Sequence, residues 1–160
     1  MGLLMGCLLL FLGPAHAATA VGSDAPAFLL PTTADAQLGR SQLEGKATLL
    51  NFWATWCAPC LAELPMLDAL SERLEGSDAQ VITINIDRRR PPVDATIKRL
   101  ELSLLVGLDP DGAVVGLFDP AAMPTSYVMD KAGEVVEVLR GALSEEDIEA
   151  LEGRLRKLAE

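Results

Sequence analysis

Two cysteines separated by two residues, Cys57 and Cys60, are the side chains of this 160-residue chain best suited to chemistry. Two thiols at this spacing can close into a disulfide within one helical turn. They follow the apolar run 47–52 and precede a helical pattern, so we expect a buried strand to deliver them to the start of a helix. The unpaired N–H groups and positive dipole end of that helix favour a thiolate over a thiol. The pattern therefore predicts thiol redox chemistry.

A structural disulfide and half of a zinc site are the alternatives for a cysteine pair at this spacing. Trp56 and Pro59 make the local pattern Trp-Cys-x-Pro-Cys, which is more specific than two bare cysteines. The expected order of strand, turn and helix is also the one that a redox-active pair requires. We therefore favour a redox-active disulfide.

The remaining cysteine and the only histidine, Cys7 and His16, lie in a segment that we expect to be removed. A zinc site on the mature chain would then need two carboxylate ligands, unlike the Cys/His sets of structural zinc sites. We predict no metal and no cofactor. Loss of His16 also excludes the Cys-His pair of thiol hydrolases and proteases.

The first stretch of the chain indicates export. Residues 3–12 are almost all apolar, which suits a signal-peptide core, and Ala15-His16-Ala17 supplies a small-x-small cleavage pattern. We predict a signal peptide over 1–17 and one domain over 18–160, in the periplasm of a bacterium or otherwise exported. No Lys or Arg precedes the apolar core, so the n-region is weak, and a retained membrane anchor is the main alternative. A lipoprotein at Cys7 is a second alternative, on the small residue that precedes this cysteine.

The chain length and the net charge restrict the number of domains and the kinds of partner that we expect. A chain of this length can bury the core of one compact domain, and we expect a monomer. The formal net charge of −10 falls entirely on the predicted mature part, because residues 1–17 contain no charged side chain. Such an acidic surface argues against binding to nucleic acid, whose phosphates need a basic face.

Apolar periodicity predicts alternating strands and helices. The expected strands are 28–30, 37–38, 47–53, 81–86, 104–106, 125–129 and 135–139. The expected helices are 58–74 with a kink at Pro65, 93–100, 113–118 and a terminal helix capped by Ser144. Residues 130–133 form a hairpin connection. This order predicts an α/β fold in which a mixed central sheet carries helices on both faces, preceded by an N-terminal hairpin.

Three runs of sequence carry a resemblance to a known family. They are residues 50–65 around the cysteines, Met123-Pro124-Thr125-Ser126-Tyr127-Val128, and Gly141-Ala142-Leu143-Ser144. Together they resemble the TlpA/ResA branch of the thioredoxin superfamily over nearly the whole mature chain. The resemblance implies a thioredoxin fold with an N-terminal hairpin and a central α-β insertion, for which residues 87–119 are long enough.

The resemblance also implies a mechanism. Cys57, expected to be exposed at the helix start, is the attacking thiolate, and the more buried Cys60 resolves the mixed disulfide. Pro124 matches a proline that the fold holds in cis beside the cysteines. Its neighbour Met123 would offer its backbone to an incoming substrate strand. An ordinary trans proline that opens a strand is the alternative.

Further site residues follow from the same comparison. Trp56 and Pro59 are predicted to contact substrate, Trp56 as an apolar wall beside Cys57. Plain thioredoxin has a buried aspartate where this chain has Asn51, which cannot titrate. Glu63 matches an acidic residue of the ResA-like members, and it could accept the Cys60 proton from the same helical face. A solvated surface glutamate is the alternative for Glu63.

Arg88, Arg89 and Arg90 follow a strand that we expect to run parallel to the central one, so they emerge at the edge of the site. They could dock an acidic partner or simply form a solvated face. Both alternatives stay open here, and the three arginines are not counted among the site residues.

The predicted function is reduction of disulfides in other exported proteins, with apocytochrome c and metal-delivery proteins as plausible clients and a membrane thiol protein as electron donor. An oxidant that donates its disulfide is the first alternative, since about 30 mV corresponds to only about 1.4 kcal/mol. A non-catalytic chaperone or binding module is the second. A peroxidase would need a threonine in place of Ala54 and a proline in place of Leu50.

Overall fold

A five-stranded mixed sheet in the order β5-β4-β3-β6-β7 positions the cysteines. The structure, a computed structural model, describes residues 19–160, so the predicted signal segment 1–17 lies outside the described residues. Within 19–160, no helix is both long enough and apolar enough to cross a membrane. The strands of the sheet are β3 (Ala47–Trp53), β4 (Ala79–Asn85), β5 (Leu105–Leu108), β6 (Thr125–Met129) and β7 (Val135–Arg140).

Helices and a short hairpin cover the sheet. The helices are α1 (Ala58–Arg73), α2 (Arg90–Leu100), α3 (Ala113–Phe118) and α4 (Glu145–Leu158), with a 3-10 turn η1 (Arg40–Gln42). The hairpin pairs β1 (Leu29–Pro31) with β2 (Gln37–Gly39) in antiparallel register. An isolated bridge between Thr32 and Gly107 ties it to the β5 edge.

The central strand β3 is buried along its whole length. It pairs in parallel with β4 and antiparallel with β6, so both of its edges are hydrogen-bonded. Side chains alternate along a strand, and Leu49, Asn51 and Trp53 therefore share one face of β3. Leu49 and Trp53 pack in the same apolar cluster as α1 and α4. Asn51 thus lies on the face that α1 covers.

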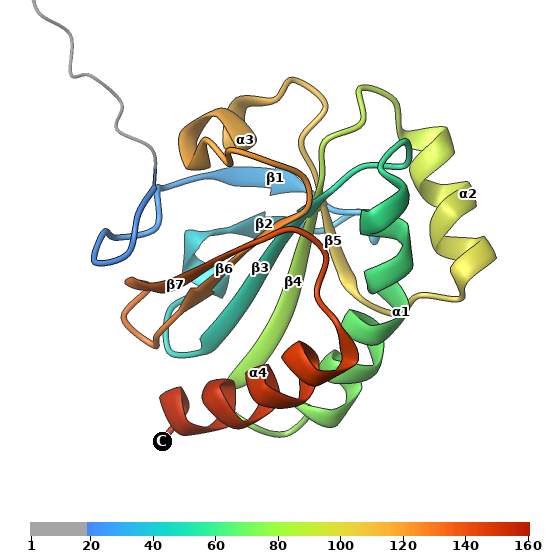
Figure 1. Cartoon of the computed structure of the whole chain (residues 1–160). Coiled ribbons are helices and arrows are strands. Elements are labelled where there is room, and N and C mark those ends of the chain that lie inside the picture. Colours follow the sequence, from blue (N-terminus) through green and yellow to red (C-terminus); the bar gives the residue numbers. More distant parts are fainter. Residues whose placement is uncertain (1–18) are drawn as a thin grey trace, which may run out of the picture.

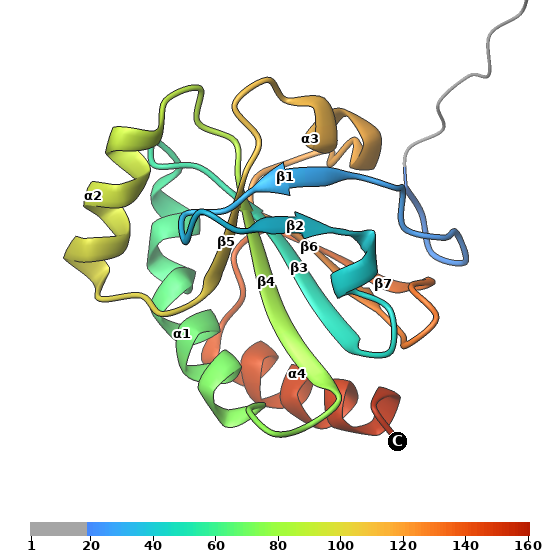
Figure 2. The same ribbon diagram turned by 180° about the vertical axis from the view of Figure 1, so that it is seen from behind.

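The two faces of the sheet bury different apolar clusters. On one face α1, α2 and α4 contribute buried side chains such as Leu64, Val93 and Leu151. On the other face, the hairpin and α3 pack Leu30, Leu38 and Phe118 against the sheet. Figure 1 shows α1 and α4 in front of the sheet, and Figure 2 shows the hairpin across the opposite face. The predicted sheet with helices on both faces is confirmed, and the hairpin completes the second layer.

Some boundaries differ from the expected ones. Helix α2 begins at Arg90 instead of residue 93, because prolines fit the first helical turn, where no N–H is needed. The β6–β7 connection extends to Glu134, which pairs with Asp24 in an isolated bridge. Helix α1 runs without a break through Pro65.

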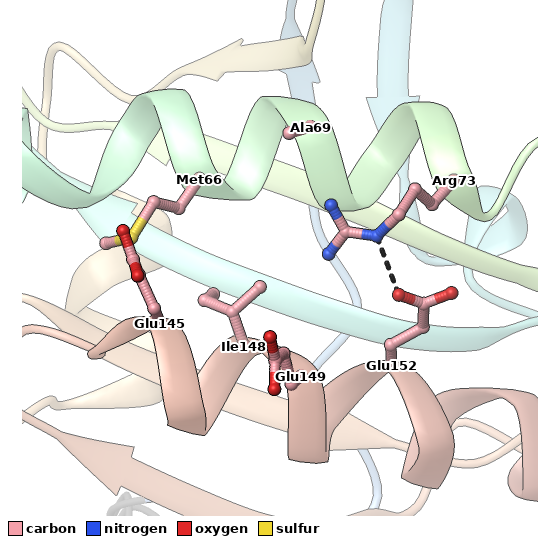
Figure 3. Close-up of a pocket in the computed structure, with 7 residues that line it drawn as sticks. All are labelled: Met66, Ala69, Arg73, Glu145, Ile148, Glu149 and Glu152. Atoms are coloured by element: carbon pink, nitrogen blue, oxygen red, sulfur yellow. Dashed lines mark hydrogen bonds and ion pairs between the residues drawn. The ribbon is translucent and has the colours of Figure 1, made fainter.

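Polar contacts fix α4 against α1. The predicted cap is present, since Ser144 and Asp147 form a capping box at the start of α4. Nε of Arg73 in α1 lies 2.6 Å from Oε2 of Glu152 in α4. Figure 3 shows this ion pair at one end of a groove between the two helices, with Met66 and Glu145 at the other end. The groove lies along the part of α1 that follows the cysteines, and it contains neither of them.

Candidate active site

The two cysteines lie at the start of α1 and are joined by a disulfide. Cys57 is the N-cap residue of α1, with extended backbone angles, and Cys60 lies in the first turn. The backbone N–H of Cys60 donates to Sγ of Cys57 at 3.3 Å. A helix N-terminus and a direct N–H donor both stabilise negative charge on that sulfur. The geometry therefore suits Cys57 to the thiolate form when the pair is reduced.

Exposure distinguishes the two cysteines. Cys57 is 6% exposed and Cys60 is fully buried. The prediction that Cys57 is exposed is therefore wrong in degree, because the residue packs into the apolar cluster beneath α1. Its neighbours Ala58 and Pro59 are exposed, and Trp56 is 67% exposed. Solvent therefore reaches the pair from the side of Cys57.

The Met123–Pro124 peptide bond is cis, as the resemblance predicts. Thr125 pairs with Phe52, so this bond lies at the end of β6 that faces the end of β3 and the start of α1. Pro124 is buried, whereas Met123 is partly exposed. Within residues 19–160 the backbone N–H and C=O of Met123 have no hydrogen-bond partner. Such a segment can pair with an extended peptide.

Glu63 is fully buried, so the alternative of a solvated surface glutamate is wrong. Its Oε1 accepts a hydrogen bond from Nδ2 of Asn51 and its Oε2 accepts one from the backbone N–H of Leu143, both at 2.8 Å. Burial raises the pKa of Glu63, and the hydrogen bonds from Leu143 and Asn51 partly oppose that rise. Glu63 is therefore an acid whose proton is held more tightly than at the surface.

Asn51 connects Glu63 to strand β6. Its Nδ2 also donates to Oγ of Ser126 at 2.9 Å, since Asn51 and Ser126 are paired in register. Its Oδ1 is buried and has no hydrogen-bond partner within the described part of the chain. Ser126 and Leu143 were not predicted as site residues, because only the register of β6 and the course of the chain after β7 bring them to the Asn51–Glu63 pair.

A second polar contact, which was not predicted from the sequence either, fixes the loop before Cys57. Oδ2 of Asp87 accepts a hydrogen bond from the Thr55 backbone N–H, and Oδ1 accepts one from the Thr55 hydroxyl, both at 2.8 Å. Asn85 also donates from its side chain to Oδ2. The available signal was that residues following parallel strands β3 and β4 share one edge of the sheet.

The site thus consists of a disulfide-bonded cysteine pair, a buried carboxylic acid and an unpartnered backbone segment. Within residues 19–160, no group of three His, Cys, Asp or Glu side chains could hold a metal ion. The chemistry available to these groups is thiol–disulfide exchange.

Comparison with known proteins agrees with this arrangement. A protein-family model described as the AhpC/TSA family matches residues 21–138. The thiol-disulfide oxidoreductase ResA of Oceanobacillus iheyensis is 35% identical over 143 residues, which cover 87% of this chain and 73% of the relative. ResA of Bacillus subtilis is 32% identical over 124 residues, which cover 78% of this chain and 69% of the relative. The chain belongs to the ResA-like members of the AhpC/TSA family.

Solved structures agree with this assignment. A thiol:disulfide interchange protein of the thioredoxin family from Chlorobium tepidum matches with a TM-score of 0.75 at 26% identity, covering 86% of this chain and 99% of its own. StoA from Bacillus subtilis, at 24% identity and a TM-score of 0.70, shares the fold over 81% of this chain and 96% of its own. This ResA-like chain therefore has a thioredoxin fold and is a thiol-disulfide oxidoreductase.

Proposed function

We propose that this ResA-like chain is exported and reduces disulfides in other exported proteins. The observation that carries the proposal is the asymmetry of the cysteine pair, in which Cys57 caps α1 beside exposed residues while Cys60 is fully buried. In an asymmetric pair, the accessible thiol attacks the client disulfide and the buried thiol resolves the mixed disulfide. The apolar segment with its small-x-small pattern at Ala15-His16-Ala17 supports export.

The reaction proceeds in two exchange steps. The Cys57 thiolate attacks one sulfur of the client disulfide, which forms a Cys57–client disulfide and releases the other client sulfur as a thiolate. Cys60 then loses its proton and attacks the Cys57 sulfur. The second client sulfur leaves, and the Cys57–Cys60 disulfide remains. Two electrons pass to the client, which gains two thiols.

The segment around the cis proline aligns the substrate. The unpartnered N–H and C=O of Met123 can form backbone hydrogen bonds with an extended client segment. Trp56 and Pro59 are exposed on either side of Cys57 in the sequence, and they supply apolar contact area for the same segment. Backbone pairing of this kind accepts clients of different sequence.

Glu63 serves the second step in this proposal. It lies three residues after Cys60, on the same helical face, and it is shielded from solvent. Because burial raises the pKa of Glu63, its carboxylate is a stronger base than a surface glutamate. Glu63 therefore accepts the proton that Cys60 loses as it attacks. The carboxyl group returns this proton to solvent or to the departing thiolate.

Repeated reduction of client disulfides requires a source of electrons that reduces the Cys57–Cys60 disulfide again. Exported bacterial proteins meet an oxidising compartment, so a reductant there needs a membrane thiol protein that supplies electrons. Apocytochrome c and metal-delivery proteins are suitable clients, because each needs its cysteines reduced before it is loaded.

Redox trapping in cells tests the direction. The Cys57–Cys60 pair should be mostly reduced in cells that contain the membrane donor and mostly oxidised in cells without it, which a gel shift after thiol alkylation measures. Cys60→Ser should accumulate mixed disulfides with clients, whereas the matched Cys57→Ser should not. The reductant proposal is wrong if the pair stays oxidised in normal cells and the purified disulfide readily oxidises an unfolded dithiol protein.

A further inference from the structure

A groove of about 450 Å³ opens beside the exposed Trp56. The segment that leaves β4 forms one side of it, and the loop before Cys57 forms the other. Its lining residues are Thr55, Trp56, Ile86, Asp87, Arg88, Arg89 and Pro92. Figures 1 and 2 both show the segment between β4 and α2 beside the start of α1, because β3 and β4 run parallel and end at the same edge.

The charges of this groove differ from those of the chain as a whole. Arg88 and Arg89 are exposed, and within residues 19–160 neither forms an ion pair. Arg90 differs, since it pairs with Asp35 and Asp94. The groove therefore carries two unpaired guanidinium groups and one carboxylate on a chain whose formal net charge is −10.

The carboxylate in the groove does not neutralise the arginines by direct contact. Both oxygens of Asp87 accept hydrogen bonds from Thr55, and Oδ2 accepts a further one from Asn85. Both oxygens of Asp87 are thus already hydrogen-bonded, and they hold the loop before Cys57 in place. The guanidinium groups of Arg88 and Arg89 remain available to a ligand, and guanidinium groups bind carboxylates with paired N–H donors.

We propose that this groove binds acidic side chains of a client segment that flank the disulfide being reduced. The inference rests on the proposed reduction of client disulfides and adds a substrate preference to it. A client sulfur that reaches Cys57 places its neighbouring residues beside Trp56, which lines the groove together with the two arginines. Exposed charges act on one another over a screening length of about 8–10 Å. The two arginines then attract Asp or Glu at these positions, and the indole of Trp56 packs against their apolar atoms.

Three synthetic peptides test the preference. Each contains one internal disulfide with the same sequence, except that the residues flanking the cysteines are Glu, Gln or Lys. The reduced protein should attack the Glu peptide about 3- to 10-fold faster than the Gln peptide at low salt, and the Lys peptide more slowly. Raising the salt from about 0.05 to about 0.5 M should reduce these ratios, because the charges are exposed.

Arg88→Gln with Arg89→Gln should bring the Glu-to-Gln rate ratio close to one and leave the Gln peptide rate unchanged. The matched control is Lys98→Gln with Arg99→Gln, which removes the same charge from the exposed end of α2, away from the groove. This control should keep the preference.

The outcomes separate the two proposals. An unchanged ratio in the Arg88/Arg89 variant, an equal loss in the control variant, or a faster reaction of the Lys peptide would overturn the acidic-client groove while reduction itself stands. Failure of the wild-type protein to reduce the neutral Gln peptide would instead overturn the proposed function, and the substrate preference with it.

Discussion

Nδ2 of Asn51 donates a 2.8 Å hydrogen bond to Oε1 of Glu63 in a part of the core where neither residue is exposed. This arrangement fits the ionised carboxylate, which can only accept hydrogen bonds. The unpartnered Oδ1 of Asn51 is a hydrogen-bond acceptor, which is what a protonated carboxyl group needs. If Glu63 is protonated, rotation of the Asn51 amide presents Oδ1 to the carboxyl O–H and to the Ser126 hydroxyl. The pair can therefore satisfy Glu63 in both protonation states.

The first prediction concerns the order of alkylation of the reduced protein. Iodoacetamide should modify Cys57 before Cys60, because Cys57 receives the Cys60 N–H and caps α1 while Cys60 is fully buried. Peptide mapping over a range of pH would show which thiol reacts. Preferential labelling of Cys60 would reverse the roles assigned to the two cysteines.

The second prediction concerns Glu63→Gln. This change removes the proposed proton acceptor and should slow disulfide exchange at neutral pH about tenfold or more, with the fold retained. Stopped-flow kinetics across pH should also show that the thiol titration has moved. Glu72→Gln is the matched control, since Glu72 is exposed on the same helix and loses the same charge. Equal rates for wild type and Glu63→Gln at every pH would leave Glu63 without a role in proton transfer.

The third prediction concerns stability against pH. Because burial raises the pKa of Glu63, the folded protein holds this proton to higher pH than the unfolded chain does. The stabilisation is complete below the unfolded pKa and is lost as pH rises through the folded pKa. The free energy of unfolding of wild type should therefore fall relative to Glu63→Gln as pH rises through this window. Urea unfolding at a series of pH values measures the difference, and parallel curves would contradict the raised pKa.

The fourth prediction concerns Asn51→Ala. Loss of one hydrogen bond to the carboxylate should raise the pKa of Glu63 further and move the pH profile of exchange to higher pH. The free energy of unfolding should decrease by about 1–3 kcal/mol. Ser126→Ala removes a partner of Asn51 without touching Glu63, so it should destabilise without moving the profile. Identical profiles for wild type and Asn51→Ala would show that Asn51 does not position Glu63.

The fifth prediction concerns the loop before Cys57. Asp87→Ala leaves the Thr55 N–H without its acceptor and should cost about 1–3 kcal/mol of stability. Amide exchange of residues 55–57 should become faster. Thr55→Val removes only the side-chain hydrogen bond and should have a smaller effect. Unchanged amide exchange in Asp87→Ala would mean that other contacts hold this loop.

Much of the fold could be predicted from the sequence because its strongest signals are local. The run 47–53 is apolar on both faces, and it forms the fully buried β3 with the expected bounds. Ser144 and Asp147 are three residues apart and form the expected capping box of α4. The start of α2 was harder to predict, because Pro91 and Pro92 look like helix breakers until the first turn of the helix is placed on them.

The site residues that lie close together in the sequence could be predicted. The contacts between residues that are far apart in the sequence could not. The spacing of Cys57 and Cys60 indicated the disulfide. The partners of Glu63 were not predictable, since Leu143 is 80 positions away in the sequence and Ser126 is reached only through the register of β6 on β3. The bond between Asp87 and Thr55 spans 32 positions and depends on two parallel strands ending together.

The hydrogen bond from the Leu143 N–H to Glu63 has a consequence for the order in which the protein acquires activity. Leu143 lies between β7 and α4, so its contact with Glu63 in α1 depends on the course of the chain after the last strand. Contacts between residues so distant in the chain close a long loop, which costs more chain entropy than a local contact does. A chain in which this segment has not docked therefore has both cysteines but lacks one hydrogen bond to Glu63, the proton acceptor of the proposed mechanism. We expect full exchange activity only from the completely folded chain.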